Sequence, residues 1–222
     1  MKYLPMMAAA AAVTLAGSSQ AQIVIGDFED GTTQGWFQNG SRPISVVADP
    51  SGNSSYVLAV DWAGANGFDW SIGLQDPANP DLKLLANGGG PQKVEFDIIW
   101  DPANDWTGDG WIQWTQIAFN YDGGWTQVNT PTAGSRDWST LSGYGEQHPE
   151  WDFIANGTPL SSGASFAQLY IATNTGENDA LNPITQGRFY IDNIVITVPE
   201  PVTAALLGLA GLVLVARRRL SR

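Results

Sequence analysis

The sequence contains no cysteine and one histidine, His148, in 222 residues. The missing cysteines exclude disulfide bonds, thiolate metal sites and cysteine nucleophiles. A lone histidine argues against histidine-based metal sites, and no GxSxG or HExxH motif surrounds it, so we expect a loop residue without a catalytic role. Stability must therefore come from core packing, helped by any ion that is bound through oxygen ligands.

Basic residues are also scarce. The chain has ten Lys and Arg against 22 Asp and Glu, and five of the basic residues lie at its two ends: Lys2, Arg217, Arg218, Arg219 and Arg222. The chain between Lys2 and Arg217 thus carries a net charge of −17. Such a body repels phosphate backbones, which excludes nucleic acid as a partner, and it attracts divalent cations.

Sustained helical periodicity is lacking between residues 23 and 197. Short runs of alternating apolar and polar residues recur instead, separated by Gly, Asn, Asp and Pro, which is typical of an all-β sandwich or barrel. We expect strands at residues 56–62, 68–74, 94–100, 111–121, 125–128, 166–173 and 188–198. One short helix is expected at residues 82–87, before three glycines.

The N-terminus has the features of a secretory signal peptide. Lys2 is followed by an apolar stretch and then by small residues around Ala21. That apolar stretch is too short for an ordinary spanning helix. We expect a signal peptide at residues 1–21 and a domain at residues 22–197.

The C-terminus combines three elements in order. Pro199, Glu200 and Pro201 precede an uncharged apolar run at residues 202–216, and Arg217, Arg218 and Arg219 follow it. This order closely resembles the PEP-CTERM sorting signal of Gram-negative bacteria, here residues 198–222. The run is expected to be a short transmembrane helix with its arginines in the cytoplasm.

The resemblance implies that an exosortase recognises the Pro-Glu-Pro segment and processes the protein. We expect a periplasmic body that is transiently anchored in the inner membrane and then sorted to the cell surface or the extracellular polysaccharide matrix. A plain tail anchor is the alternative.

The two edges of the domain carry a second resemblance. An opening run at residues 25–36, IGDFEDGTTQGW, and a closing run at residues 189–194, FYIDNI, are similar to those of jelly-roll carbohydrate-binding modules, which are galactose-binding-like β-sandwiches. The resemblance implies a structural Ca²⁺ ion where the first and last strands meet. Its side-chain ligands would be Glu29 and Asp192, and the loop at residues 49–55 could add carbonyl oxygens. The alternative is that both acids are ordinary charges at strand ends.

Ten tryptophans suggest both core and surface roles. Four are in register with apolar neighbours and are expected in the core: Trp36, Trp62, Trp70 and Trp100. Six lie among Gly, Asp, Gln and Thr, where flat rings beside amides suit sugars: Trp106, Trp111, Trp114, Trp125, Trp138 and Trp151.

Strand alternation narrows the candidates for a saccharide site. Trp114, Gln116 and Asn120 share one face of their strand, and Gln168 and Tyr170 lie on the face of another strand away from the apolar residues. We expect a concave sheet face built from these five residues to bind polysaccharide. A solvated sheet face with incidental aromatics is the alternative.

No catalytic constellation is complete. Glu95 and Asp97 are comparable to the ExDxxE strand of laminarinase-like glycosidases, but Trp100 replaces the last acid. The sequence therefore predicts a non-catalytic, exported saccharide-binding protein. A self-associating matrix protein and a glycoside hydrolase remain alternatives.

Overall fold

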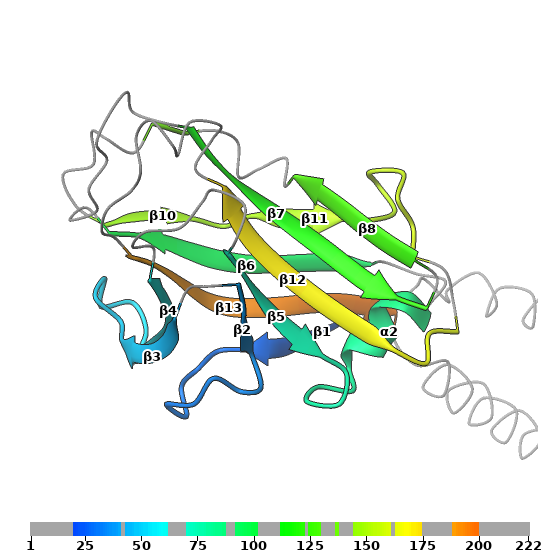
Figure 1. The fold of residues 1–222 in the computed structure, drawn as a ribbon, viewed down its shortest axis with the longest axis horizontal. Helices are drawn as coiled ribbons and strands as arrows, with labels where there is room; N and C mark the ends of the chain where they lie inside the picture. Colours follow the sequence, from blue (N-terminus) through cyan, green and yellow to red (C-terminus); the bar gives the residue numbers. More distant parts are fainter. Residues whose placement is uncertain are drawn as a thin grey trace, which may run out of the picture.

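The protein folds into two antiparallel β-sheets that pack face to face (Figure 1). The computed structural model describes residues 20–40, 43–61, 70–87, 92–101, 112–122, 124–129, 136–137, 144–160, 163–174 and 188–199. All strand pairs in this part of the chain are antiparallel, which confirms the expected all-β sandwich.

The first sheet is organised around one long strand, β13. Its strand order is β10-β6-β13-β4-β3, with β1 pairing to β13 and β11 pairing to β6. One edge of β13 pairs with β4 near its start and with β1 near its end, and the other edge pairs with β6. The strands are β1 (Gln20–Gly26), β3 (Ile44–Ala48), β4 (Tyr56–Asp61), β6 (Lys93–Trp100), β10 (Gly145–Gln147), β11 (Glu150–Asp152) and β13 (Arg188–Pro199).

The second sheet has the order β2-β5-β12-β7-β8, with the short β9 pairing to β7. Its strands are β2 (Phe37–Gly40), β5 (Trp70–Gln75), β7 (Ile112–Tyr121), β8 (Gly124–Asn129), β9 (Arg136–Asp137) and β12 (Ala167–Asn174). In Figure 1 the strands β5, β12 and β7 lie across β6 and β13 of the first sheet.

The core lies between the sheets because alternate residues of each strand point inward. Phe96 and Ile98 of β6 are buried there, as are Phe119 of β7 and Leu169 of β12. A smaller apolar cluster covers the other face of the first sheet; it consists of Val57, Ala59, Ile99 and Tyr190. The alternation of β4 predicts that only one of its faces is buried. Both faces are buried, because Leu58 and Val60 join the core between the sheets and Val57 and Ala59 join the smaller cluster.

The helix α2 (Leu82–Asn87) closes one end of the sandwich against β12 and β13. Its buried residues Leu82, Leu85 and Ala86 follow helical spacing and join the core. The helix spans the predicted residues 82–87, which confirms that prediction. Among the described residues, none of the helices has the length and apolar character needed to cross a membrane.

The first strand of the domain, β1, pairs with the last strand, β13, and this pairing begins two residues before the predicted start of the domain at residue 22. β1 begins at Gln20, which pairs with Pro199 of β13, and Ala21 pairs with Val198. Cleavage after Ala21 would leave Gln22 to Gly26 paired with β13. The rest of the predicted signal peptide, residues 1–19, and the apolar run at residues 202–216 lie outside the described residues.

Candidate functional site

Three aromatic side chains from separate strands form a row across the outer face of the second sheet. The rings of Phe37 on β2 and Tyr170 on β12 are 6.2 Å apart between centroids, edge to face. The rings of Tyr170 and Trp125 on β8 are 5.7 Å apart, with planes inclined at 37°. We call Phe37, Tyr170 and Trp125 the aromatic row. Trp125 is 55% exposed, so the row offers ring surface to solvent.

The register of the strands builds this row. Gly73 on β5 pairs with Phe37 on one side and with Tyr170 on the other. A Cβ atom at Gly73 would lie 2.5 Å from Phe37 Cζ and 2.9 Å from Tyr170 Cε1. Glycine is therefore required here because the two rings lie directly against its backbone.

Three of the five predicted saccharide-site residues form one hydrogen-bonded group. Gln168 Oε1 accepts hydrogen bonds from Asn120 Nδ2, at 2.9 Å, and from the Tyr170 hydroxyl, at 3.0 Å. Burial raises the pKa of Tyr170, so the hydroxyl keeps its proton and donates. Gln168 is 8% exposed and thus holds its two partners in place more than it faces solvent.

The other two predicted residues, Trp114 and Gln116, lie on the same strand as Asn120 at alternate positions. Their backbones pair with Asn174 and Ala172 of β12. Their side chains lie outside what the structure describes, so their part in a saccharide site stays a prediction.

Across β2, β5, β12, β8 and residues 114–120 of β7, the strand positions that share a face with the aromatic row carry no charged residue, although the chain has 22 acids. These positions are Phe37, Asn39, Ser71, Gly73, Gln75, Trp114, Gln116, Ala118, Asn120, Trp125, Gln127, Asn129, Gln168, Tyr170, Ala172 and Asn174. At the far end of β7, Ile112 on this face pairs with Asp137 of β9. Amides and aromatic rings on one neutral surface favour ligands that are rich in hydroxyl groups and C–H faces.

The remaining tryptophans divide between core and undescribed residues. Trp36 is 2% exposed and donates a hydrogen bond from Nε1 to the Ile25 carbonyl, so its predicted core position is confirmed. Trp151 is wrongly predicted as a surface residue: it is 6% exposed and packs edge to face on Phe153. Its strand β11 pairs with β6, which turns the ring into the sandwich. For Trp70 and Trp100 only the backbone is described, and Trp62, Trp106, Trp111 and Trp138 lie outside the described residues.

The predicted calcium ligands come together beside the loop at residues 49–55. Glu29 Oε1 accepts a hydrogen bond from the Ser55 amide at 3.0 Å, and Asp192 Oδ2 accepts one from the Ser54 hydroxyl at 2.5 Å. Asp49 organises the loop by accepting from the amides of Ser51, Asn53 and Ser54.

The burial and hydrogen bonding of Asp192 show whether a cation would suit this place. Asp192 is 2% exposed, and its Oδ1 atom has no hydrogen-bond partner. Burial raises its pKa to about 6, and the charges of Asp97 and Glu29 add to this effect. A buried, unpartnered carboxylate oxygen beside a second carboxylate is a donor set that suits Ca²⁺.

The sorting motif is described only at its first residue. Pro199 ends β13. Glu200, Pro201, Arg217, Arg218 and Arg219 lie outside the described residues.

Sequence reasoning missed Phe37 and Gly73 as parts of the aromatic row and gave Trp125 no partner. Phe37 carried no signal in the sequence, because β2 has four residues, which are too few for alternation to show which face each side chain occupies.

Solved structures with the same fold support the architecture. The CBM22-1 xylan-binding domain from Paenibacillus barcinonensis Xyn10C aligns over 84% of this chain and 100% of its own, with 13% identity and a TM-score of 0.50. Its CBM22-2 xylan-binding domain aligns over 82% and 99%, with 15% identity and a TM-score of 0.52. CBM28, a module specific for non-crystalline cellulose, aligns over 78% and 94%, with 16% identity and a TM-score of 0.51. No family model and no curated protein matches the sequence.

Proposed function

We propose that the protein is a non-catalytic saccharide-binding protein, and that the aromatic row with its neighbouring amides is the binding surface. The observation that carries this proposal is the row itself: rings from three strands, supported by Gly73, on a face whose positions in β2, β5, β8 and β12 carry no charged residue. Rings stack on the C–H faces of sugars, and amides pair with their hydroxyl groups. The body shares its fold with carbohydrate-binding modules, which is consistent with this use of the sheet.

The neutral face suits neutral polysaccharides better than charged ones. Xylan and non-crystalline cellulose are bound by the modules with the same fold, so they are the first ligands to test. Asn120 and Tyr170 share the carbonyl of Gln168, which fixes both side chains before a ligand arrives. Such preorganisation lowers the entropic cost of binding.

A structural calcium ion belongs to the proposal. Glu29 and Asp192 would hold it beside the loop at residues 49–55, joining the opening segment to β13. What supports it is the unpartnered Oδ1 of the buried Asp192. Bound there, the ion would neutralise a carboxylate that is costly to bury.

Delivery to the cell surface or matrix is the third part. The order of Pro199-Glu200-Pro201, the apolar run and Arg217 to Arg219 supports export, transient anchoring in the inner membrane and recognition by an exosortase. Expression with and without an exosortase, followed by mass determination of the C-terminus, tests this part. Identical C-termini in both strains would contradict it.

Affinity electrophoresis of the whole chain in gels that contain xylan or amorphous cellulose tests saccharide binding. The wild type should be retarded, and Tyr170→Ala and Trp125→Ala should lose most of the retardation. Tyr144→Ala is the matched control, because Tyr144 is also exposed but packs on Tyr190 of the first sheet. Retardation of all four proteins alike would place binding elsewhere.

A further inference from the structure

The first sheet carries a polar group of its own at its edge, where strands β10 and β11 are separated by His148 and Pro149. Gln147 pairs with Ile98 and Glu150 pairs with Glu95, so one register continues across the interruption. His148 therefore lies beside Asp97, and its Nδ1 is 2.5 Å from Asp97 Oδ1. The chain's only histidine is thus tied to a carboxylate on the neighbouring strand.

A second carboxylate joins this pair. Glu146 and His148 are two residues apart along the edge, so both side chains lie on the same face. Asp97, Glu146 and His148 can each bring one ligand atom to within 4.8 Å of the others. The three offer one imidazole nitrogen and two carboxylate oxygens, a donor set that Zn²⁺ accepts and that calcium, which prefers oxygen alone, uses less well.

Asp97 and Glu146 each also accept a hydrogen bond from the side-chain amide of an asparagine. Asn193 Nδ2 donates to Asp97 Oδ2 at 2.8 Å, and Asn53 Nδ2 donates to Glu146 Oε2 at 3.3 Å. Asn193 has a φ of 49° at a bulge in β13, where the register with β6 shifts. Outer hydrogen bonds of this kind orient ligands and leave the second carboxylate oxygen for an ion.

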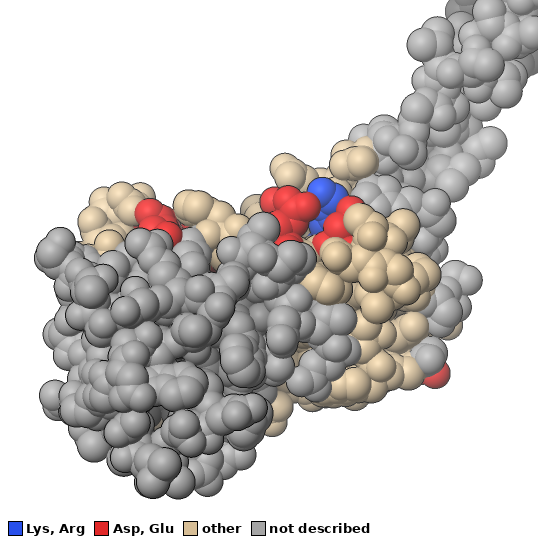
Figure 2. Space-filling model, turned by 90° about the horizontal axis from the view of Figure 1, so that it is seen from above, with Lys and Arg blue, Asp and Glu red and all other residues tan. Residues whose placement is uncertain are grey.

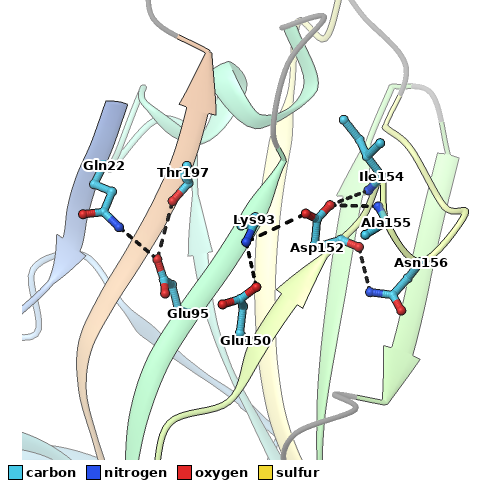
Figure 3. Close-up of polar contacts among 9 residues, drawn as sticks. All are labelled: Gln22, Lys93, Glu95, Glu150, Asp152, Ile154, Ala155, Asn156 and Thr197. Carbon is cyan, nitrogen blue, oxygen red and sulfur yellow. Dashed lines mark hydrogen bonds and ion pairs between the residues drawn. The ribbon is translucent and has the colours of Figure 1, made fainter. Parts of the chain in front are cut away.

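Basic side chains near this group are engaged with other acids. Lys93 pairs with Glu150 at 2.8 Å and approaches Asp152 at 3.9 Å, as Figure 3 shows. In the described part of the chain, no lysine or arginine forms an ion pair with Asp97 or Glu146. Figure 2, the view from above, shows acidic side chains in more than one place and only one basic patch among them.

A third acid, which belongs to the calcium site, lies beside Asp97. Asp192 pairs directly with Asp97 across the sheet and is 2% exposed. Asp97 therefore lies beside two other acids, Glu146 and Asp192, and its ion pair among the described residues is with His148. Such an arrangement is stabilised by a dication.

The group is open to solvent. A pocket of about 370 Å³ lies on this face and is lined by Glu95, Asp97, His148 and Asn193 among others. Within it, Glu95 is occupied by hydrogen bonds from Gln22 and Thr197 (Figure 3). An ion held by Asp97, Glu146 and His148 would therefore have room for water in its remaining positions.

We propose that Asp97, Glu146 and His148 bind a transition-metal ion of the zinc type, at a site distinct from the one that Glu29 and Asp192 would form. The ion would replace the proton that His148 shares with Asp97. Donors around a tetrahedral zinc are about 3.3 Å apart, so His148 and Asp97 would separate by a fraction of an ångström. His148 is 68% exposed, which leaves its ring free to make this movement.

Calorimetric titration of the whole chain with ZnCl₂ tests the proposal, with the protein purified without a polyhistidine tag. Calcium at millimolar concentration is present throughout to fill sites that contain only oxygen ligands. The wild type should bind one Zn²⁺ per chain, and His148→Gln and Asp97→Asn should each weaken binding at least about tenfold. Glu150→Gln is the matched control: it removes the same charge from the same pocket, and its zinc affinity should stay near that of the wild type.

The ring resonances of His148 provide a second readout, since no other imidazole is present. Zn²⁺ should shift them in the wild type and in Glu150→Gln, whereas calcium should not. Unchanged zinc affinity in His148→Gln, or equal loss in Glu150→Gln, would show diffuse attraction to an acidic surface and overturn the proposal. Because His148 is exposed, its replacement should leave the fold intact, and circular dichroism checks this.

Discussion

Asp192 buries a carboxylate on the outer face of the first sheet, beside the loop at residues 49–55, with one oxygen unpaired, and this burial raises its pKa to about 6. In the unfolded chain the same group titrates near 3.8. The folded state therefore binds more protons between these values, and the stability gained from protonation is lost as pH rises through about 6.

Asp192→Asn should therefore stabilise the protein at pH 7.5 in the presence of a chelator, by about 2 kcal/mol. Near pH 4 the gain should disappear, because the wild-type carboxyl group is then protonated. Urea unfolding at the two pH values measures this. Calcium should raise the unfolding midpoint of the wild type and leave that of Asp192→Asn unchanged. A variant less stable than the wild type at pH 7.5 without calcium would contradict this view of Asp192.

His148 offers a second test at the scale of single residues. Its hydrogen bond to Asp97, and the charge of that acid, raise its pKa above 6.5. In metal-free buffer, NMR titration of the His148 ring should show this elevated pKa, and Asp97→Asn should bring it back toward 6.5. Asp122→Asn, an exposed change elsewhere, should not alter it. If the pKa of the His148 ring is the same in Asp97→Asn as in the wild type, Asp97 is not the cause of the elevated value.

At the scale of elements, the aromatic row depends on how β2, β5 and β12 pair. A methyl group at Gly73 would meet both Phe37 and Tyr170, so the rings or the strands must move apart. Gly73→Ala should lower the free energy of unfolding by about 1–3 kcal/mol and weaken saccharide binding. Urea unfolding and affinity electrophoresis measure the two effects.

A double-mutant cycle identifies the cause of that loss. In a Phe37→Ala background the nearest atom is gone, and Gly73→Ala should cost clearly less than in the wild type. Equal costs in both backgrounds would show that the contact with Phe37 is not responsible.

The sequence predicted the elements whose residues alternate strongly. β4, β6, β7, β8, β12, β13 and α2 all appear close to their expected ranges. β2, β10 and β11 have four residues or fewer, which is too short for a period of two to stand out, and they were not predicted. Trp151 was misplaced for this reason, because only its pairing with Val94 shows which side of the sheet it faces.

At the scale of the whole molecule, the two sheets present different chemistry on their outer faces. The face with the aromatic row has no charged residue at its positions in β2, β5, β8 and β12, while the face with Asp97, Glu146 and Asp192 is acidic. Alternation along single strands predicted that Asn120, Gln168 and Tyr170 would share a site, and their hydrogen bonds bring them together. Trp125 was expected to suit sugars, but its contact with Tyr170 and the contribution of Phe37 could not be predicted, since both depend on the order of strands far apart in the sequence.

The affinity of the whole chain for soluble xylan or amorphous cellulose, compared with that of Tyr170→Ala, tests whether the aromatic row binds saccharide. Tyr170 contacts both Phe37 and Trp125, so its loss interrupts the row at its middle. We expect measurable binding by the wild type and a loss of at least about tenfold in the variant, with stacking supplying about 1–2 kcal/mol. Binding that is equal in the two proteins, while both remain folded, would contradict this expectation.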